Sequence, residues 1–152
     1  MKLLEVLHPE AINIDLRARD KKTVLDELAA PVARITGTPQ DELVRVLMER
    51  ERLGSTGIGG GIGIPHGKLQ GLPSLLVGFG LSRHGVAFES MDGRPTHLFF
   101  LLLSPENEAG QHLKLLARIS RLLKQEEFKS QLMQAASTEA VLEIIGETDE
   151  AF

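Results

Sequence analysis

The chain of 152 residues contains no cysteine, tryptophan or tyrosine. Without cysteine it has no disulfides, no thiolate nucleophile and no cysteine-ligated zinc or iron. Six phenylalanines are its only aromatic residues, which leaves few surfaces on which bases or sugars can stack. A chain of about 150 residues can bury a core that is stable without crosslinks, so we expect a single domain covering residues 1–152.

The chain also lacks an excess of positive charge and a long apolar run. Its 17 lysines and arginines against 21 aspartates and glutamates give a net charge of −4, so we expect no nucleic-acid partner. The longest apolar run, Leu98–Leu103, has six residues, whereas a membrane-spanning helix needs about 20. Glu5 interrupts any secretory apolar segment at the N-terminus. We therefore expect no membrane insertion and a cytoplasmic location.

Strands are predicted where apolar residues alternate or follow one another in short runs. A two-residue period is typical of a half-buried strand, and a short apolar run is typical of a buried one. On these grounds we expect strands at residues 11–16, 75–81 and 97–103, and a short strand around Ile62 and Ile64.

Helices are predicted where apolar residues recur at helical spacing. Asp20 can cap the first helix, although Pro31 within it should kink or divide it. Thr38 and Pro39 form a second start signal, a hydroxyl cap before a proline, for a helix that runs to about Leu53.

Two more helices are predicted near the C-terminus, one from about Ala109 and one capped by Ser137 or Thr138. Strands interspersed with helices on this scale indicate an α/β fold, in which a β-sheet is covered by helices.

Arg50 lies on the apolar face of the helix that follows Pro39, beside Leu43 and Leu47. A guanidinium there needs an anionic partner or a wet cleft, because an unpaired buried charge is costly. Position alone leaves three explanations open: a structural ion pair, a side chain that reaches solvent from the last turn, or a group that binds an anionic ligand.

His112 lies on the core-facing stripe of a helix, close to its start and in line with Leu116 and Ile119. Burial and the helix dipole both disfavour the imidazolium, so we expect a neutral ring whose N–H, with the exposed helix amides, favours a bound anion. The alternative is a histidine satisfied by a backbone carbonyl.

His66 stands in the segment Gly63-Ile64-Pro65-His66-Gly67. Ile64 anchors a strand, Pro65 cannot continue a ladder and Gly67 lets the chain turn away, so the imidazole is held rigidly at a strand end. A neutral imidazole whose one nitrogen is held by an acceptor can attack phosphorus with the other. A loop histidine without a role is the alternative.

We expect no metal site and no cofactor. The five histidines form no His-x-His or His-x-x-x-His pair. The glycine-rich segment 54–67 matches neither G-x-x-x-x-G-K-[ST] nor G-x-G-x-x-G, the two common nucleotide-binding patterns.

Residues 50–59 read RERLGSTGIG and residues 62–69 read IGIPHGKL. Together they closely resemble the active-site stretch of the fructose/mannitol-type EIIA domain of the bacterial phosphotransferase system, and most of all the stand-alone nitrogen-regulatory EIIA. The resemblance extends over essentially the whole chain and implies a mixed β-sheet with helices on both faces. Two positions depart from the pattern: Gly60, where a polar residue is common, and Gly63, where alanine is usual.

This resemblance implies that His66 receives a phosphoryl group from an HPr- or NPr-like carrier protein, with Arg50 and His112 as catalytic partners. Ser55 and Thr56 match the family's hydroxyl pair and are expected to bind phosphate. The acceptor would be an EIIB domain or a regulated protein such as a transporter or a sensor kinase. Because both partners must bring their own phosphorylated side chain to His66, we expect an open depression with an apolar rim.

Two further functions remain open at this point. The domain can be a regulatory binding module whose phosphorylation state selects its protein targets, which the absence of an EIIB- or EIIC-like segment favours over sugar uptake. A histidine-dependent hydrolase is the weaker alternative, because the sequence has no Gly-x-Ser-x-Gly elbow and no metal-ligand motif.

Overall fold

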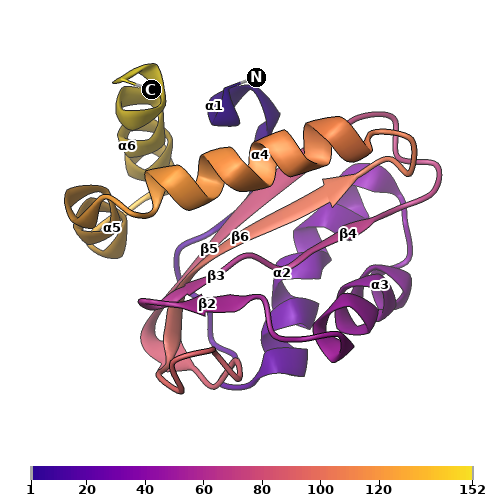
Figure 1. Cartoon of the computed structure of the whole chain (residues 1–152), viewed down its shortest axis with the longest axis horizontal. Helices are drawn as coiled ribbons and strands as arrows, with labels where there is room; N and C mark the ends of the chain where they lie inside the picture. Colours follow the sequence, from indigo (N-terminus) through magenta and orange to yellow (C-terminus); the bar gives the residue numbers. More distant parts are fainter. Residues whose placement is uncertain (1, 152) are drawn as a thin grey trace.

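The computed structural model describes residues 2–151 and shows a mixed β-sheet with helices on both faces, as the sequence predicts (Figure 1). In sheet order the strands are β1 (Leu7–Asn13), β5 (Leu76–Val86), β6 (Thr96–Ser104), β3 (Ile62–Gly63) and β2 (Gly57–Gly59), while β4 (His66–Lys68) also pairs with β6. Strand β6 is antiparallel to β5 and parallel to both β3 and β4. The central strand β6 therefore carries β4, and with it His66, at one end of the sheet.

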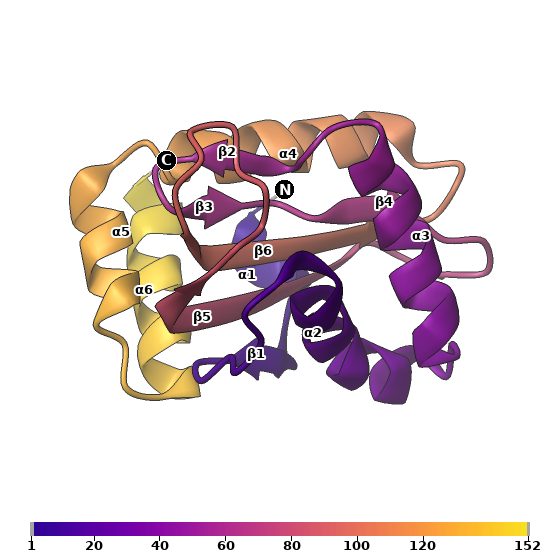
Figure 2. The same ribbon diagram turned by 90° about the horizontal axis from the view of Figure 1, so that it is seen from below.

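One face of the sheet is covered by α2 (Lys21–Thr36) and α3 (Gln40–Arg52), which lie in front of it in Figure 2. The other face is covered by α4 (Ala109–Leu122), α5 (Glu126–Met133) and α6 (Thr138–Ala151), with the short α1 (Leu3–Val6) beside α6. Each face has its own apolar cluster. The function of the sheet is thus to hold two helical layers at fixed positions around the ends of its strands.

The burial of both faces of β6 explains why its sequence is a continuous apolar run. Alternate residues of a strand point to opposite faces. Leu98, Phe100 and Leu102 pack in the cluster on the α4 side, whereas Phe99 and Leu101 pack in the cluster on the α2 side. Both sets are buried, so no polar position interrupts the run.

The first strand begins and ends earlier than the sequence predicts, at residues 7–13 rather than 11–16. It lies at the edge of the sheet, where Pro9 and Glu10 are exposed and break the apolar alternation. Its pairing with β5 is irregular between Leu7 and Ile12, which also obscures the period in the sequence.

Pro31 does not divide α2, because the helix is continuous from residue 21 to 36. Residues on its apolar face, such as Val24, Leu28 and Val32, are buried on both sides of the proline and hold the helix together. The start of α3 also differs from the prediction: Pro39 occupies the cap position and Thr38 makes no capping hydrogen bond.

The other cap predictions are confirmed. The Asp20 carboxylate accepts a hydrogen bond from the Thr23 amide at 2.9 Å, and the Ser137 hydroxyl accepts one from the Ala140 amide at 3.0 Å. The helix α5 and the one-turn α1 were not predicted. Across residues 2–151, every helix is too short or too polar to cross a bilayer.

Candidate active site

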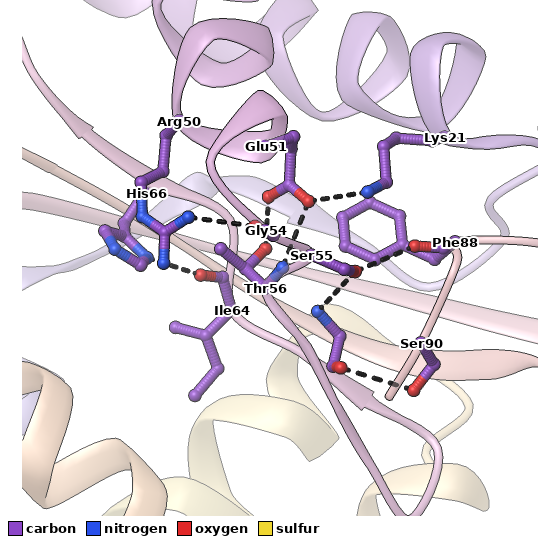
Figure 3. Close-up of polar contacts among 11 residues, drawn as sticks. Lys21, Arg50, Glu51, Gly54, Ser55, Thr56, Ile64, His66, Phe88 and Ser90 are labelled. Atoms are coloured by element: carbon purple, nitrogen blue, oxygen red, sulfur yellow. Dashed lines mark hydrogen bonds and ion pairs between the residues drawn. The ribbon is translucent and has the colours of Figure 1, made fainter. Parts of the chain in front are cut away.

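His66 is the first residue of β4, and its register partner is Leu102 of β6. Its Nδ1 atom lies 2.7 Å from the carbonyl oxygen of Ile64, visible in Figure 3. A carbonyl oxygen can only accept, so Nδ1 carries the proton and Nε2 keeps its lone pair. This is the tautomer that a nucleophilic imidazole needs.

The surroundings of His66 favour its neutral form. Partial burial lowers the pKa of His66, the Ile64 carbonyl acts in the opposite direction, and the nearby Arg50 guanidinium lowers the pKa again. The net pKa lies below the usual 6.5, so the ring is uncharged near neutral pH. A lone pair is therefore available on Nε2.

Gly67 brings α3 against β4. A Cβ atom at this position would lie 2.7 Å from Val46 Cγ1, which is closer than carbon atoms can approach. Glycine thus permits the close packing that places the last turn of α3, and Arg50 on it, next to His66 (Figure 3).

Arg50 is half-buried, and its Nη1 atom donates to the Gly54 carbonyl oxygen at 2.9 Å. Among the residues that the structure describes, no carboxylate forms an ion pair with it. The structural ion pair considered from the sequence is therefore not the explanation of its position. Its charge remains available to an anion that arrives from solvent.

His112 is buried in the first turn of α4, and its ring lies edge-on to that of His66 with 5.4 Å between the centroids. Its Nδ1 atom lies 2.5 Å from the Ser104 hydroxyl oxygen. Burial, followed by the neighbouring His66 and Lys68, lowers the pKa of His112 to about 4. Both imidazoles are thus neutral, as expected for His112 from its place near the start of a buried helix face.

The structure brings Arg50, His66 and His112 together around one depression of about 430 Å³. Leu53, which lines the depression and is 85% exposed, agrees with the apolar rim expected from the sequence. The complete lining is Val46, Glu49, Arg50, Leu53, His66, Gly67, Lys68 and His112.

Ser55 and Thr56 do not line this depression. The Ser55 hydroxyl donates to the Phe88 carbonyl oxygen at 3.0 Å and accepts from the Gly57 amide at 3.0 Å. The buried Thr56 hydroxyl donates to the Glu51 carboxylate (Figure 3). Both hydroxyls therefore hold the loop after α3 in this structure, and phosphate binding by them stays a prediction.

Glu51 is a residue of this region whose role was not predicted from the sequence. Its carboxylate is 2% exposed, accepts from the Thr56 amide at 3.0 Å and pairs with Lys21 of α2 at 2.8 Å. Lys21 in turn lies over the Phe88 ring, 4.8 Å from its centroid. Glu51 shares a helix face with the buried Leu47, so the helical pattern that singled out Arg50 could have found it too.

The remaining histidines bind backbone atoms away from the depression. The His97 and His84 rings lie 2.8 Å and 3.2 Å from the carbonyl oxygens of Ser82 and Ala18. Within residues 2–151, no group of three or more metal-binding side chains converges.

The sequence and the fold were compared with known proteins. Residues 5–148 match the family model described as the phosphoenolpyruvate-dependent sugar phosphotransferase system, EIIA 2. A nitrogen regulatory protein from Bradyrhizobium diazoefficiens is 41% identical over 145 residues, which is 95% of each chain. The fructose-specific EIIABC component of Bacillus subtilis is 36% identical over 151 residues, covering 98% of this chain and 24% of that longer protein.

A crystal structure of the nitrogen regulatory protein IIA-Ntr from Neisseria meningitidis superposes with a TM-score of 0.88 and 34% identity. The match covers 94% of this chain and 98% of the other. The family model, the relative of 41% identity and the superposed fold thus agree with one another, and the chain belongs to the EIIA type 2 family of the phosphotransferase system.

Proposed function

We propose that His66 accepts a phosphoryl group from a phosphorylated HPr- or NPr-like carrier protein. The observation that carries this proposal is the Ile64 carbonyl on Nδ1, which leaves the Nε2 lone pair free at an open depression. Family membership supports phosphoryl transfer as the general chemistry. The residue and its covalent intermediate are our inference from the geometry.

In the proposed step, the Nε2 lone pair of His66 forms a bond to phosphorus. The bond between phosphorus and the carrier's imidazole breaks, and its electron pair leaves with the carrier's nitrogen. The His66 ring becomes more positive as it gains the phosphoryl group, and the Ile64 carbonyl dipole at Nδ1 stabilises that charge. Transfer to the acceptor reverses these roles.

The three oxygens of the transferred group carry negative charge that the protein must offset. Arg50 can do this with a planar fork of N–H groups, after its Nη1 leaves the Gly54 carbonyl or through its remaining N–H groups. His112 supplies a neutral N–H donor from the opposite helical layer. Ser55 and Thr56 support the site indirectly, since they fix the loop that carries Gly54.

The open shape of the site fits a protein as donor and a protein as acceptor. Both must bring a side chain to His66, which a closed pocket would prevent. The exposed Leu53 gives such partners apolar surface at the rim.

The identity of the acceptor separates two forms of this function. The relatives called nitrogen regulatory proteins support a regulatory role, in which phosphorylation of His66 changes affinity for proteins such as transporters or sensor kinases. The fructose-specific EIIABC relative supports the alternative, transfer to an EIIB domain during sugar uptake. Measured affinities for candidate targets decide between them, because equal affinities with and without phosphate leave no switch.

Phosphoryl uptake is tested with a radiolabelled phosphorylated HPr-type carrier. We expect one phosphoryl group per chain, lost in mild acid and retained in alkali, as is typical of phosphohistidine. His66→Ala should take up no label, whereas His97→Ala, a control histidine bound to the Ser82 carbonyl, should be labelled normally. Label that persists in His66→Ala would move the site elsewhere and refute the proposal.

A further inference from the structure

Ser104 is the last residue of β6 and is fully buried between the sheet and α4. It follows Leu98, Phe100 and Leu102 in the strand alternation and so points to the α4 side. Its backbone carbonyl accepts from the Leu69 amide at 2.9 Å, which ties it to the chain just after β4. Its position relative to His66 is therefore set by the sheet.

The hydroxyl of Ser104 lies 2.5 Å from His112 Nδ1, and the direction of this hydrogen bond can be worked out. Among the residues described by the structure, this nitrogen is the only hydrogen-bond partner of the hydroxyl. If Nδ1 carried the proton, the hydroxyl hydrogen would be buried without an acceptor, which is unfavourable. The hydroxyl therefore donates, Nδ1 accepts, and the proton of the neutral His112 ring sits on Nε2.

The two imidazoles of the site then have opposite tautomers. His66 has its proton on Nδ1, held by the Ile64 carbonyl, and a lone pair on Nε2. His112 has a lone pair on Nδ1, held by Ser104, and a proton on Nε2. One ring is prepared as a nucleophile and the other as a donor to phosphoryl oxygens, with 5.4 Å between their centroids.

We propose that Ser104 is a positioning residue for phosphoryl transfer, which fixes the tautomer and the orientation of His112 so that Nε2–H faces the group on His66. This inference rests on the proposed function of His66. It gives a role to a residue that acts through His112 and not on the phosphoryl group itself, and it assigns the proton of neutral His112 to Nε2.

The test compares Ser104→Val, which removes the hydroxyl, with Ser104→Thr, which has a similar volume and keeps it. Nitrogen-15 NMR of the histidine rings in the unphosphorylated protein reports the tautomer and the hydrogen bonding of each nitrogen. We expect the wild type and Ser104→Thr to show His112 protonated at Nε2 with a hydrogen-bonded Nδ1. In Ser104→Val the Nδ1 resonance should move to the position of a nitrogen without a donor.

The same proteins are then labelled with the phosphorylated HPr-type carrier. Loss of one ordinary hydrogen bond should slow uptake about fivefold in Ser104→Val, with normal uptake in Ser104→Thr. If the valine variant does not fold, Ser104→Ala serves the same purpose with a smaller side chain.

Three results would overturn the inference: His112 protonated at Nδ1 in the wild type, an unchanged Nδ1 resonance without the hydroxyl, or equal uptake rates in all variants. The NMR result is obtained without any phosphoryl donor. Absence of label on the wild-type protein would instead refute the proposed function, so the two failures are distinguishable.

Discussion

The buried pair of Lys21 and Glu51 predicts a large loss of stability when its positive charge is removed. The two side chains are 9% and 2% exposed, and their charged atoms are 2.8 Å apart. Lys21→Met leaves the Glu51 carboxylate buried without a counterion, and removing one partner of such a pair typically costs about 3–5 kcal/mol. We expect the low end, about 3 kcal/mol, because the Thr56 amide and hydroxyl still donate to the carboxylate.

Urea unfolding measures this loss. With an m-value of about 2 kcal/mol/M, the midpoint should fall by roughly 1.5 M while the slope stays the same. Lys22→Met is the matched control, because it makes the same substitution at the adjacent, exposed position. The double variant Lys21→Met with Glu51→Gln should lose less stability than the two single variants summed, since no lone charge remains.

A midpoint for Lys21→Met equal to that of Lys22→Met would refute the reasoning. It would show that water or a rearranged partner satisfies Glu51 once Lys21 is gone. The pair would then contribute nothing to the stability of the loop that joins α3 to β2.

Further predictions concern Arg50 and His112. Arg50→Ala should slow phosphoryl uptake about 100-fold in single-turnover transfer, because the guanidinium offsets the charge of the phosphoryl oxygens. The urea midpoint should stay unchanged, because the side chain is half-exposed. An unchanged transfer rate would contradict the role of Arg50. Protonation of His112 should destabilise the fold, because its pKa is lowered from 6.5 to about 4. Its stabilising contribution is complete above pH 6.5 and is lost as the pH falls to about 4, a loss of about 3 kcal/mol. Urea midpoints across this range should therefore fall more steeply in the wild type than in His112→Gln, and parallel curves would contradict the prediction.

The sequence predicted those parts of the fold in which apolar residues form a continuous run or recur at helical spacing. Strands β5 and β6 are strongly apolar, and α2, α3 and α4 each bury one face, so these two signals are visible without knowledge of the partners of each element. The short strand β4 and helix α5 were missed because they are too short to show a period. In α5 only Phe128 and Leu132 are buried.

The candidate site was predictable where one residue contradicts its local pattern. Arg50 and His112 are polar residues on apolar helix faces, and His66 stands between a proline and a glycine at a strand end. Partners distant in the chain could not be predicted. Nothing in the sequence pairs Lys21 with Glu51, 30 residues away, because that contact depends on how α2 packs against α3.

The contacts of the serine and threonine hydroxyls could not be predicted from the sequence either. Ser55 and Thr56 match the family's motif, yet their hydroxyls bind Phe88 and Glu51 away from the depression. Ser104 is a lone serine at the end of an apolar run, a pattern that predicts no role, yet its hydroxyl contacts His112. A side chain's direction depends on which strand face is buried and what packs there, and these are properties of the assembled fold.

The two histidines at the depression share one arrangement. Each is held through an atom that the proposed reaction does not use: His66 by the Ile64 carbonyl on Nδ1 and His112 by Ser104 on its Nδ1. Arg50 differs, because its Nη1 is bound to the Gly54 carbonyl and is either shared or released if it binds phosphate. Because the two neutral rings are already oriented, little free energy is spent on ordering them when the phosphoryl group enters. Giving up one arginine hydrogen bond costs free energy, so the phosphoryl group is bound less tightly. A carrier must give up what it binds, so a site whose arginine is shared with the Gly54 carbonyl is suited to passing phosphate on.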